Sequence, residues 1–491
     1  MRKVILIAFY FNQINEIASK RLRALAKYLP EFGWEVIVIA PDLGNVPLEN
    51  DSLDSKIVIT DYEDMFSHYL NKFKFKKGNT KDVSFEGLDS NSNSGKDNDR
   101  LKDSSSVSNP LLSKAVSLAG EIFAYPDGMK YWYEPAFEEA SKIIESEDIS
   151  AIISSSWPIT CHTIAKDLKK KYDIPWVADL RDLWNLNPYV SHSFIREHFE
   201  LNLEKKTFEN VDALTSTSEL AKETLSTLHP DKRIEAILSG YDEDDFKVLD
   251  SFKEDDMDDF KVLDSFKEEG DFKVLDSFKE DDMDDFKVLE SSHEDNVEDL
   301  SSNSSSKLKF IYAGSLYGGK RDPELLFKAI RELEDESKID SSKISIEFYG
   351  DRGNLDEIGM KYGLSDILKI GGRISHDEVL KKQADSDVLL LISWNDEKEK
   401  IFIPGKLYEY FALRKPVLSI GYKEGSLNDL IKETNVGYHV SDLNSTKEAV
   451  LGIYNEFKER GSIKLSSDAD VEKYSMRNMA SNFAKLLNEL N

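Results

Sequence analysis

The chain has 491 residues, of which 40% are hydrophobic, and its formal net charge is −29. A chain of this length is too long for one hydrophobic core, so we expect two domains with additional segments. Residues 241–300 hold 25 Asp and Glu against 7 Lys and Arg, so 25 − 7 = 18 of the excess negative charges are local, and the remainder lacks the basic excess that nucleic-acid binding needs.

The N-terminal part of the chain predicts the start of a parallel sheet. Residues 3–9 (KVILIAF) read as a buried strand, apolar residues then recur at helical spacing up to Gly33, and residues 35–40 (EVIVIA) form a second strand. This is a βαβ unit, which seeds a doubly wound sheet. The alternation continues with a helix near 135–145, a strand at 150–153, a helix at 158–171 and strands at 175–179 and 212–216.

A second series of strands and helices begins at residues 309–314 (KFIYAG), followed by a helix at 322–334. Further strands are expected at 344–349, 367–370, 388–393 and 416–420. Two such series predict an α/β protein with two Rossmann-like doubly wound domains that face each other across a cleft. We expect a first domain at 1–241, a linker at 242–307, a second domain at 308–473 and a C-terminal helix at 474–491 that packs back on the first domain.

Two segments depart from this pattern. Residues 78–109, rich in Asn, Ser, Asp and Gly, predict a disordered insertion. Residues 242–307 repeat the sequence FKVL, which begins at 246, 260, 272 and 286 within acidic surroundings. Like charges at this density keep a chain extended, so a solvated spacer is preferred to a ligand-binding tract.

The carboxyl ends of strands in such sheets bind ligands, which directs attention to the loops that follow them. After Gly314 the sequence SLYGGKRDPE brings glycines, the cations Lys320 and Arg321, and the start of a helix. This combination suits a phosphate or diphosphate, although a plain surface turn is an alternative.

The sequence IPGKLYEYFALRKPVLSIG places Lys406 and Glu409 on one face at the start of a helix. Lys406 would add a third cation beside the diphosphate, and the Glu409 carboxylate would accept hydrogen bonds from two hydroxyls of a ribose. The alternative is a surface ion pair worth a few tenths of a kcal/mol.

At this point the sequence resembles glycosyltransferase family 4, a group of B-type glycosyltransferases with two Rossmann-like domains. The resemblance rests on PGKLYEYFALRKPVL and on stretches that agree in order along nearly the whole chain outside the two insertions. They are SSSWPITCHTIAKDLKKKYDIPWVADLRDLW (154–184), LTSTSELAKETL (214–225), ILSGYDEDDF (237–246), YAGSLYGGKRDPELLFKAI (312–330) and ADSDVLLL (384–391).

The resemblance implies roles for residues on both sides of the cleft. His162 would contact the transferred sugar, Lys320 would neutralise the diphosphate and Glu409 would bind the ribose, so these three are the predicted catalytic residues. The implied donor site comprises Gly314, Ser315, Lys320, Arg321, Gly405, Lys406, Leu407 and Glu409. Asn12, Gln13 and Asp182 are the implied acceptor-side residues.

The implied reaction moves a hexosyl group from a nucleotide diphosphate sugar to an acceptor hydroxyl with retention of configuration, in the biosynthesis of surface polysaccharides or of glycolipid or glycoprotein glycans. We expect no cofactor and no metal requirement, because cations already neutralise the diphosphate. The chain departs from the family pattern at Ile401, where the family has a glutamate, and at Ser315, where it often has an arginine; Arg321 is a candidate replacement. The first loop, residues 11–21, lacks the usual glycines.

The expected location is cytoplasmic. The single cysteine, Cys161, excludes an intramolecular disulfide, and no apolar run is long enough to span a membrane. The segment 65–78 interleaves lysines with aromatic residues, and an apolar stretch follows at 110–124. We therefore expect peripheral association with an anionic membrane surface, where a lipid-linked or glycan acceptor would be met.

Three other functions remain open at this stage. A nucleotide-sugar 2-epimerase shares the fold and would act on the donor without an acceptor. A non-catalytic nucleotide-sugar-binding protein would explain the changes at Ile401 and Ser315. An interaction scaffold would depend on the acidic repeat, and deletion of 247–300 would then abolish function.

Overall fold

The computed structural model describes residues 1–13, 17–44, 55–65, 67–68, 125–190, 193–246 and 307–491. Three predicted features lie outside these residues: the insertion at 78–109, the apolar stretch at 110–124 and all but the ends of the acidic repeat. Most of the basic and aromatic segment 65–78 also lies outside them.

The first domain is built on a parallel sheet of seven strands in the order β3-β2-β1-β4-β5-β6-β7. The strands are β1 (Arg2–Ile7), β2 (Trp34–Pro41), β3 (Lys56–Thr60), β4 (Ile149–Ser155), β5 (Trp176–Leu180), β6 (Ala213–Ser216) and β7 (Ile234–Ala236). The helices are α1 (Ile17–Tyr28), α4 (Tyr133–Ser146), α5 (Thr160–Tyr172), α6 (Phe194–Thr207) and α7 (Glu219–Leu228).

The second domain is built on a parallel sheet of six strands in the order β10-β9-β8-β11-β12-β13. The strands are β8 (Leu308–Gly314), β9 (Ile344–Gly350), β10 (Leu368–Gly372), β11 (Val388–Ile392), β12 (Val417–Ile420) and β13 (Gly437–Val440). The helices are α9 (Glu324–Asp335), α10 (Leu355–Tyr362), α11 (His376–Ala384), α12 (Gly405–Leu413), α13 (Ser426–Thr434) and α14 (Leu443–Arg460).

The central strands of both sheets are buried on both faces, which explains their continuous apolar runs. In β1, for example, Ile5 and Ile7 belong to one apolar cluster, while Val4 and Leu6 belong to another on the opposite face. The predicted α/β fold with two Rossmann-like domains is therefore confirmed.

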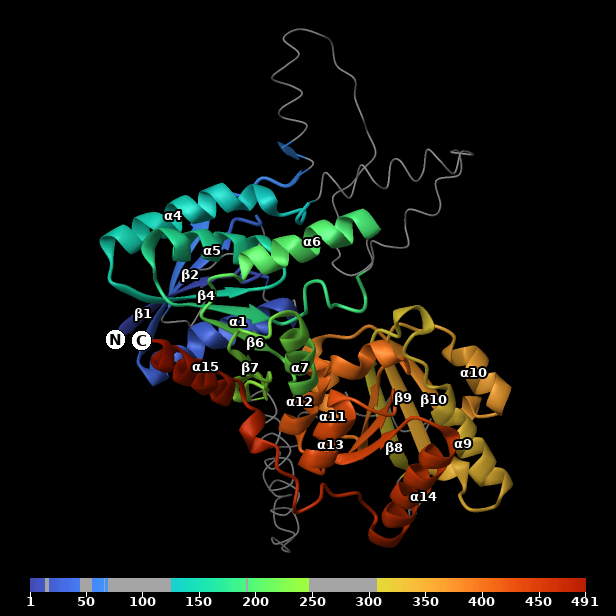
Figure 1. The fold of residues 1–491 in the computed structure, drawn as a ribbon. Coiled ribbons are helices and arrows are strands. Elements are labelled where there is room, and N and C mark those ends of the chain that lie inside the picture. Colours follow the sequence, from blue (N-terminus) through green and yellow to red (C-terminus); the bar gives the residue numbers. More distant parts are fainter. Residues whose placement is uncertain (14–16, 45–54, 66, 69–124, 191–192, 247–306) are drawn as a thin grey trace, which may run out of the picture.

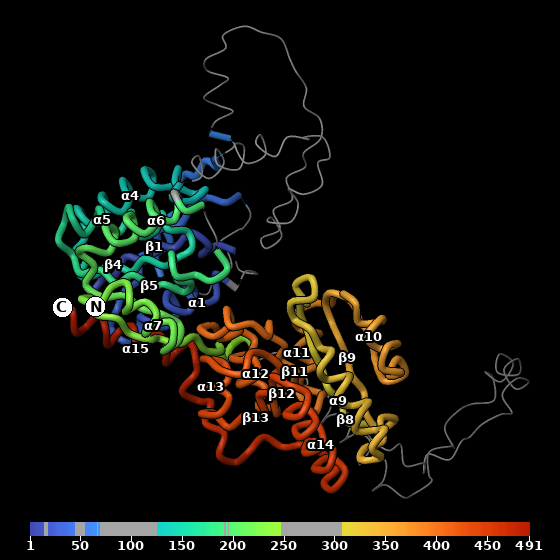
Figure 2. Tube along the Cα trace, turned by 45° about the vertical axis from the view of Figure 1, so that its right-hand side comes forward, coloured from blue at the N-terminus to red at the C-terminus, as the bar shows by residue number. Residues whose placement is uncertain are grey.

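The chain crosses between the domains twice, and the two crossings lie side by side. Tyr241 N donates to Tyr474 O at 3.0 Å, and Met476 N donates to Tyr241 O at 2.8 Å. Gly240 is needed here, because a Cβ at this position would lie 2.3 Å from the carbonyl carbon of Ser475. The last helix, α15 (Met476–Leu490), then packs against α1, and the two termini lie close together on the first domain (Figures 1 and 2).

The strand order reverses direction between β1 and β4 in the first sheet and between β8 and β11 in the second. Ligands of doubly wound sheets bind beyond the carboxyl ends of strands at these switch points. The segments after β1, β4, β8 and β11 are therefore where a site is expected. Within the described ranges, none of the helices is long and apolar enough to cross a membrane.

Candidate functional site

Lys406 and Gly314 meet at the switch point of the second domain. Lys406 lies in the first turn of α12, and its amine donates to the carbonyl oxygen of Ala313 at the end of β8. A Cβ on Gly314 would lie 1.7 Å from the Lys406 Nζ atom, and the φ of Gly314 is 146°. Only glycine at position 314 therefore allows the amine to approach the strand end.

The Lys406 side chain is half-buried, and its amine lies near a second cation. Burial, together with the positive charge of Arg321, lowers the pKa of Lys406 to about 8. The Lys406 Nζ atom also lies 4.7 Å from the centroid of the Tyr312 ring. An anion bound here would relieve the repulsion between the two cations.

The loop after β8 holds the other predicted cations against aromatic rings. The Arg321 guanidinium lies 4.3 Å from the centroid of the Tyr317 ring, and the Lys320 amine lies 5.1 Å from that of Trp394. Trp394 follows β11, the strand across the switch point, so β8 and β11 both contribute to this surface.

Ser315 is engaged within its own loop. Its hydroxyl donates to Asp351, which follows β9, and accepts from the Tyr317 N–H at 3.1 Å. Ser315 therefore orders the loop that carries Lys320 and Arg321.

Glu409 lies one turn after Lys406 on α12 and faces the first domain. Its Oε1 atom lies 2.9 Å from the Lys20 amine, which belongs to α1. Burial by itself would lower the pKa of Lys20, but the Glu409 carboxylate more than offsets this effect, so the pKa is raised.

Two other predicted donor-site residues on α12 differ in exposure. Gly405 is exposed at the helix start, and Leu407 is fully buried in the core.

The acceptor-side residues Asn12 and Gln13 follow β1, and Asp182 follows β5. Asn12 is 7% exposed, and its Oδ1 atom has no hydrogen-bond partner among the described residues. Gln13 is half-buried, and its N–H donates to the carbonyl of Tyr10 at 3.2 Å. Burial raises the pKa of Asp182, although Arg181 opposes this.

His162 is placed differently from the residues above. It lies in the first turn of α5, is fully buried and packs edge-to-face on Phe208. Its Nδ1 atom lies 2.8 Å from the Ser154 hydroxyl, which also accepts from the Trp176 indole N–H at 2.8 Å. Burial lowers the pKa of His162 to about 3, so the ring is neutral. His162 has no exposed surface in this conformation, and its Nε2 atom has no hydrogen-bond partner among the described residues.

A buried ion pair fixes the first domain beneath these loops. Arg21 of α1 makes two hydrogen bonds to the Asp179 carboxylate, at 3.0 and 3.1 Å. The hydroxyls of Ser155 and Thr215 donate to the same carboxylate at 2.9 and 2.8 Å. Burial by itself would raise the pKa of Asp179, but Arg21 and these donors hold it below its usual range.

The position at which the family resemblance implies a glutamate, Ile401, lies at the contact between the domains. Its side chain packs against the apolar core of the first domain, and its carbonyl accepts from the Ser218 hydroxyl at 2.7 Å. Two residues earlier, Glu399 accepts from the Tyr189 hydroxyl of the first domain, and burial raises the pKa of Glu399 to about 7. Tyr189 also stacks on Trp394, with ring centroids 6.0 Å apart.

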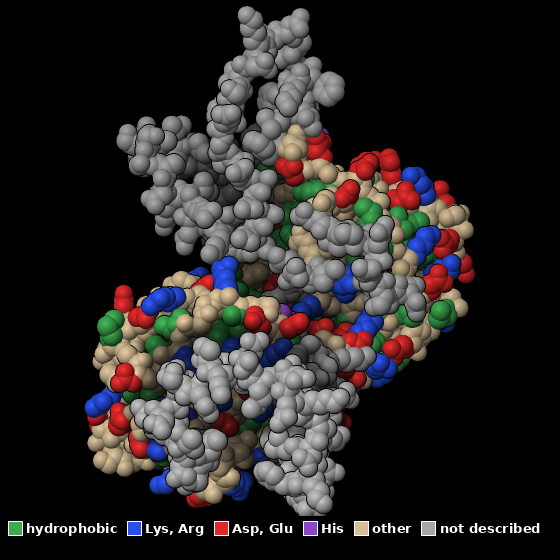
Figure 3. Space-filling model, turned by 180° about the vertical axis from the view of Figure 1, so that it is seen from behind, with side chains coloured by type: hydrophobic (Ala, Val, Ile, Leu, Met, Phe, Trp, Pro, Cys, Tyr) green, Lys and Arg blue, Asp and Glu red, His purple; other side chains and the backbone are tan. Residues whose placement is uncertain are grey.

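Sequence reasoning missed Tyr312, Trp394 and Lys20. The loop that contains Trp394 could be identified as a candidate because it follows a predicted strand. The contact of Trp394 with Lys320 could not be predicted, because it joins two loops far apart in the sequence. The contact of Lys20 with Glu409 joins the two domains. In the space-filling view, Lys and Arg side chains lie beside Asp and Glu side chains along the junction of the domains (Figure 3).

The second-domain residues can hold an anionic group. Lys406 and Arg321 lie close together, Lys320 is exposed nearby, and α12 begins without a side-chain cap, which leaves N–H groups at its start. Among the described residues, no group of three His, Cys, Asp or Glu side chains is arranged to hold a metal ion.

Comparisons with known proteins place the fold. No family model and no curated protein matches the chain. Among solved structures, it is similar to sucrose-phosphate synthase from Thermosynechococcus elongatus, with 13% identity over 100% of this chain and 99% of that chain and a TM-score of 0.54. A glycosyltransferase from Rickettsia africae ESF-5 has 14% identity over 100% of this chain and 98% of that chain, with a TM-score of 0.52. The chain therefore has the two-domain fold of the B-type glycosyltransferases.

Proposed function

We propose that the chain is a glycosyltransferase that transfers a hexosyl group from a nucleotide diphosphate sugar to an acceptor hydroxyl. The observation that carries this proposal is the half-buried Lys406 amine, which lies at the switch point of the second sheet, hydrogen-bonded to the Ala313 carbonyl and near Arg321. Cations at this point of a doubly wound sheet suit a diphosphate. The likeness of the fold to a sucrose-phosphate synthase and a glycosyltransferase agrees with it.

The second domain would bind the donor. Lys406, Arg321 and the start of α12 would hold the diphosphate, with Lys320 at the exposed side. Glu409, one turn further along α12, would accept hydrogen bonds from the ribose hydroxyls while its carboxylate keeps the ion pair with Lys20.

Catalysis would depend on stabilising the departing nucleoside diphosphate. The negative charge that develops on this leaving group would be stabilised by the cations and the helix N–H groups. Removal of one such donor typically costs roughly 100- to 1000-fold in rate. We propose retention of configuration from the resemblance to family 4, and no metal requirement. His162 would be a positioning residue, because it contacts Ser154 at the end of β4 and has no exposed surface.

The first domain would present the acceptor through Asn12, Gln13 and Asp182. The amide oxygen of Asn12, which has no hydrogen-bond partner in the described part of the chain, is suited to accept a hydrogen bond from an acceptor hydroxyl. A role in the synthesis of surface polysaccharides or of glycolipid or glycoprotein glycans, and a place on the inner face of the cell membrane, stay predictions from the sequence. Flotation of the full chain with anionic liposomes at low salt tests the membrane prediction, and no binding would end it.

Incubation with a panel of nucleotide sugars, with and without saccharide acceptors and in EDTA, tests the function. We expect nucleoside diphosphate release that depends on the acceptor and survives EDTA, with the donor's anomeric configuration kept in the product as seen by NMR. Conversion of the donor without any acceptor would instead identify an epimerase. Donor binding without turnover on any acceptor would identify a binding protein.

A further inference from the structure

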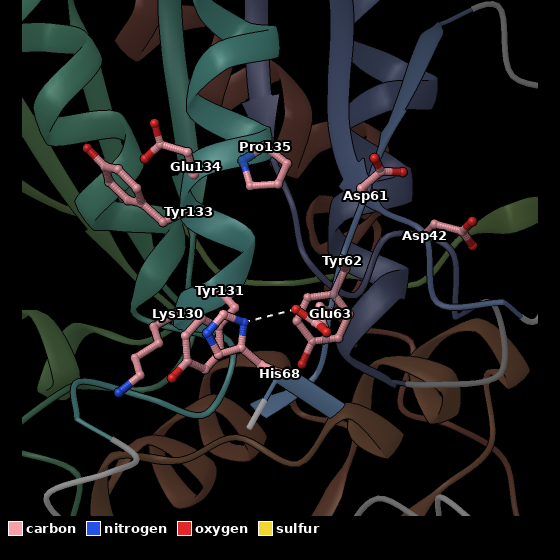
Figure 4. A pocket seen from close by; sticks show the side chains of 10 residues that line it. All are labelled: Asp42, Asp61, Tyr62, Glu63, His68, Lys130, Tyr131, Tyr133, Glu134 and Pro135. Carbon is pink, nitrogen blue, oxygen red and sulfur yellow. Dashed lines mark hydrogen bonds and ion pairs between the residues drawn. The ribbon is translucent and has the colours of Figure 1, made fainter. Parts of the chain in front are cut away.

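A cavity of about 660 Å³ lies on the first domain at the carboxyl edge of its sheet. Its walls come from the segments that follow β2 and β3, from the short turn at 130–132 and from the start of α4 (Figure 4). This volume lies in the range typical of small-molecule sites, roughly 300–1,000 Å³. The proposed donor-binding residues all belong to the second domain, and none of them lines this cavity.

Carboxylates dominate the charge of the cavity. Asp42 and Asp61 lie on one side, Glu134 lies on the other, and Glu63 lies at one end (Figure 4). The one lysine, Lys130, points away from them and donates to the Tyr125 carbonyl at 3.2 Å. Even with His68 protonated, the four carboxylates among the described lining residues outnumber their two cations, so this part of the wall disfavours a phosphate or a uronate.

Aromatic rings form much of the wall that the described residues make. Tyr62, Tyr131 and Tyr133 line the cavity, and the His68 ring stacks on Tyr131 with centroids 3.9 Å apart. Glu63 Oε2 lies 2.9 Å from His68 Nδ1, which fixes this stack. The faces of aromatic rings offer rigid apolar area and attract cations, while carboxylates accept hydroxyl and ammonium hydrogens.

The cavity adjoins the acceptor side of the proposed enzyme. Tyr62 packs edge-to-face on Phe9, with ring centroids 5.1 Å apart, and Phe9 belongs to the segment after β1 that continues to Asn12. Since β1, β2 and β3 are neighbouring parallel strands, the segments that follow them share one edge of the sheet.

We propose that this cavity binds a saccharide unit that carries a free, protonated amino group. The carboxylates and ring faces attract the ammonium group, and the same carboxylates accept hydrogen bonds from the sugar hydroxyls. That this saccharide is the acceptor rests on the proposed function, but its binding does not. A metal ion is a poor alternative, since none of the described acidic and histidine side chains form a group of three that could ligate one.

Calorimetric titration of the full chain with three probes tests this proposal: the trimer of glucosamine, the trimer of N-acetylglucosamine and a trimer of galacturonic acid. At a pH near 6 the glucosamine amines are protonated. We expect the glucosamine trimer to bind at least about tenfold more tightly than its acetylated counterpart, with an affinity that falls as salt is added. Equal affinity for the two glucosamine probes, tighter binding of the uronate, or no binding of any probe would overturn the proposal.

Variants of residues inside and outside the cavity test whether the glucosamine trimer binds there. Asp61→Asn and Glu134→Gln should each weaken binding of the glucosamine trimer about tenfold, because each removes one carboxylate from the wall. Glu138→Gln changes the net charge equally but lies one turn further along α4, outside the cavity, and should keep the affinity of the parent. Tyr131→Phe should retain binding and Tyr131→Ala should lose it. If Glu138→Gln weakens binding as much as Glu134→Gln, the cavity is not the site.

The same titrations separate this proposal from the proposed function. Lys406→Met should strongly weaken binding of nucleoside diphosphates while it leaves binding of the glucosamine trimer intact. If the trimer binds and no nucleoside diphosphate does, the saccharide site stands and the transferase assignment fails. If nucleoside diphosphates bind and the trimer does not, the saccharide site fails alone.

Discussion

The Lys20 amine of the first domain lies 2.9 Å from the Glu409 carboxylate of the second. Lys20 also lies 3.7 Å from Asp245, which follows the first crossing between the domains. The carboxylate proposed to hold the ribose thus takes part in the contact between the domains. If Glu409 holds the ribose as proposed, donor binding and the contact between the domains would be linked through this one side chain.

Glu409→Gln should weaken binding of a nucleoside diphosphate by roughly 10- to 100-fold, since hydrogen bonds to a charged acceptor are lost. Inorganic pyrophosphate, which has no ribose, should bind the variant and the parent equally. Calorimetric titration with both ligands checks this, with Glu459→Gln, an exposed carboxylate on α14, as control. Equal loss of pyrophosphate binding would show that Glu409 does not act through the ribose.

Lys406 should make donor binding depend on pH. Its pKa is about 8 because its side chain is half-buried and lies near Arg321, and a bound diphosphate would raise this value. Binding should therefore take up a proton near pH 8, and affinity should fall about tenfold between pH 7 and pH 9. Titrations in buffers with different heats of ionisation measure the proton uptake. Lys406→Met should bind more weakly and take up no proton at Lys406; unchanged uptake would place the titrating group elsewhere.

The central strands of both sheets could be predicted from the sequence, because burial on both faces makes them continuous apolar runs. The strands not predicted, β3, β7 and β13, all lie at sheet edges. Edge strands are short and less uniformly apolar: β7 has three residues, and β13 reads GYHV. Their pairing depends on a neighbouring strand that local sequence does not reveal.

The donor side could be located from glycines, cations and helix starts close together in the sequence. The contacts of Lys406 with Gly314 and of Lys20 with Glu409 could not, because they join residues 92 and 389 positions apart. Burial of His162 was equally hidden, since a histidine near the start of a helix can face either a ligand or the core.

Glu399 should make stability depend on pH. Its pKa is about 7 in the folded chain, because of burial, against an ordinary value of 4.5, so the folded state holds more protons between these values. Stability should therefore fall as pH rises from about 4.5 to 7, and this contribution should vanish in Glu399→Gln. Thermal unfolding of both proteins between pH 5 and 8 measures the difference. Glu397→Gln, an exposed neighbour, should follow the parent; a constant difference between parent and Glu399→Gln would contradict the prediction.

Asp179→Asn should destabilise the first domain by about 3–5 kcal/mol, because it leaves the Arg21 guanidinium without a compensating charge in a buried place. Asp173→Asn removes a carboxylate that is 95% exposed and that, within the described part of the chain, forms an ion pair only with Lys169, so it should cost little. Denaturant unfolding followed by tryptophan fluorescence compares the two. Similar losses in both variants would mean that the buried pair contributes no more than a surface one.

The most direct test of the central claim is the thermal unfolding of the full chain and of Lys406→Met in the presence of uridine, guanosine, adenosine and thymidine diphosphate hexoses. We predict that at least one of them, at 100 times its Kd, raises the Tm of the parent by roughly 5–10 °C, and that Lys406→Met loses most of this shift. If no nucleotide sugar shifts the parent, or if the variant shifts as much as the parent, the second domain does not bind a sugar donor through Lys406.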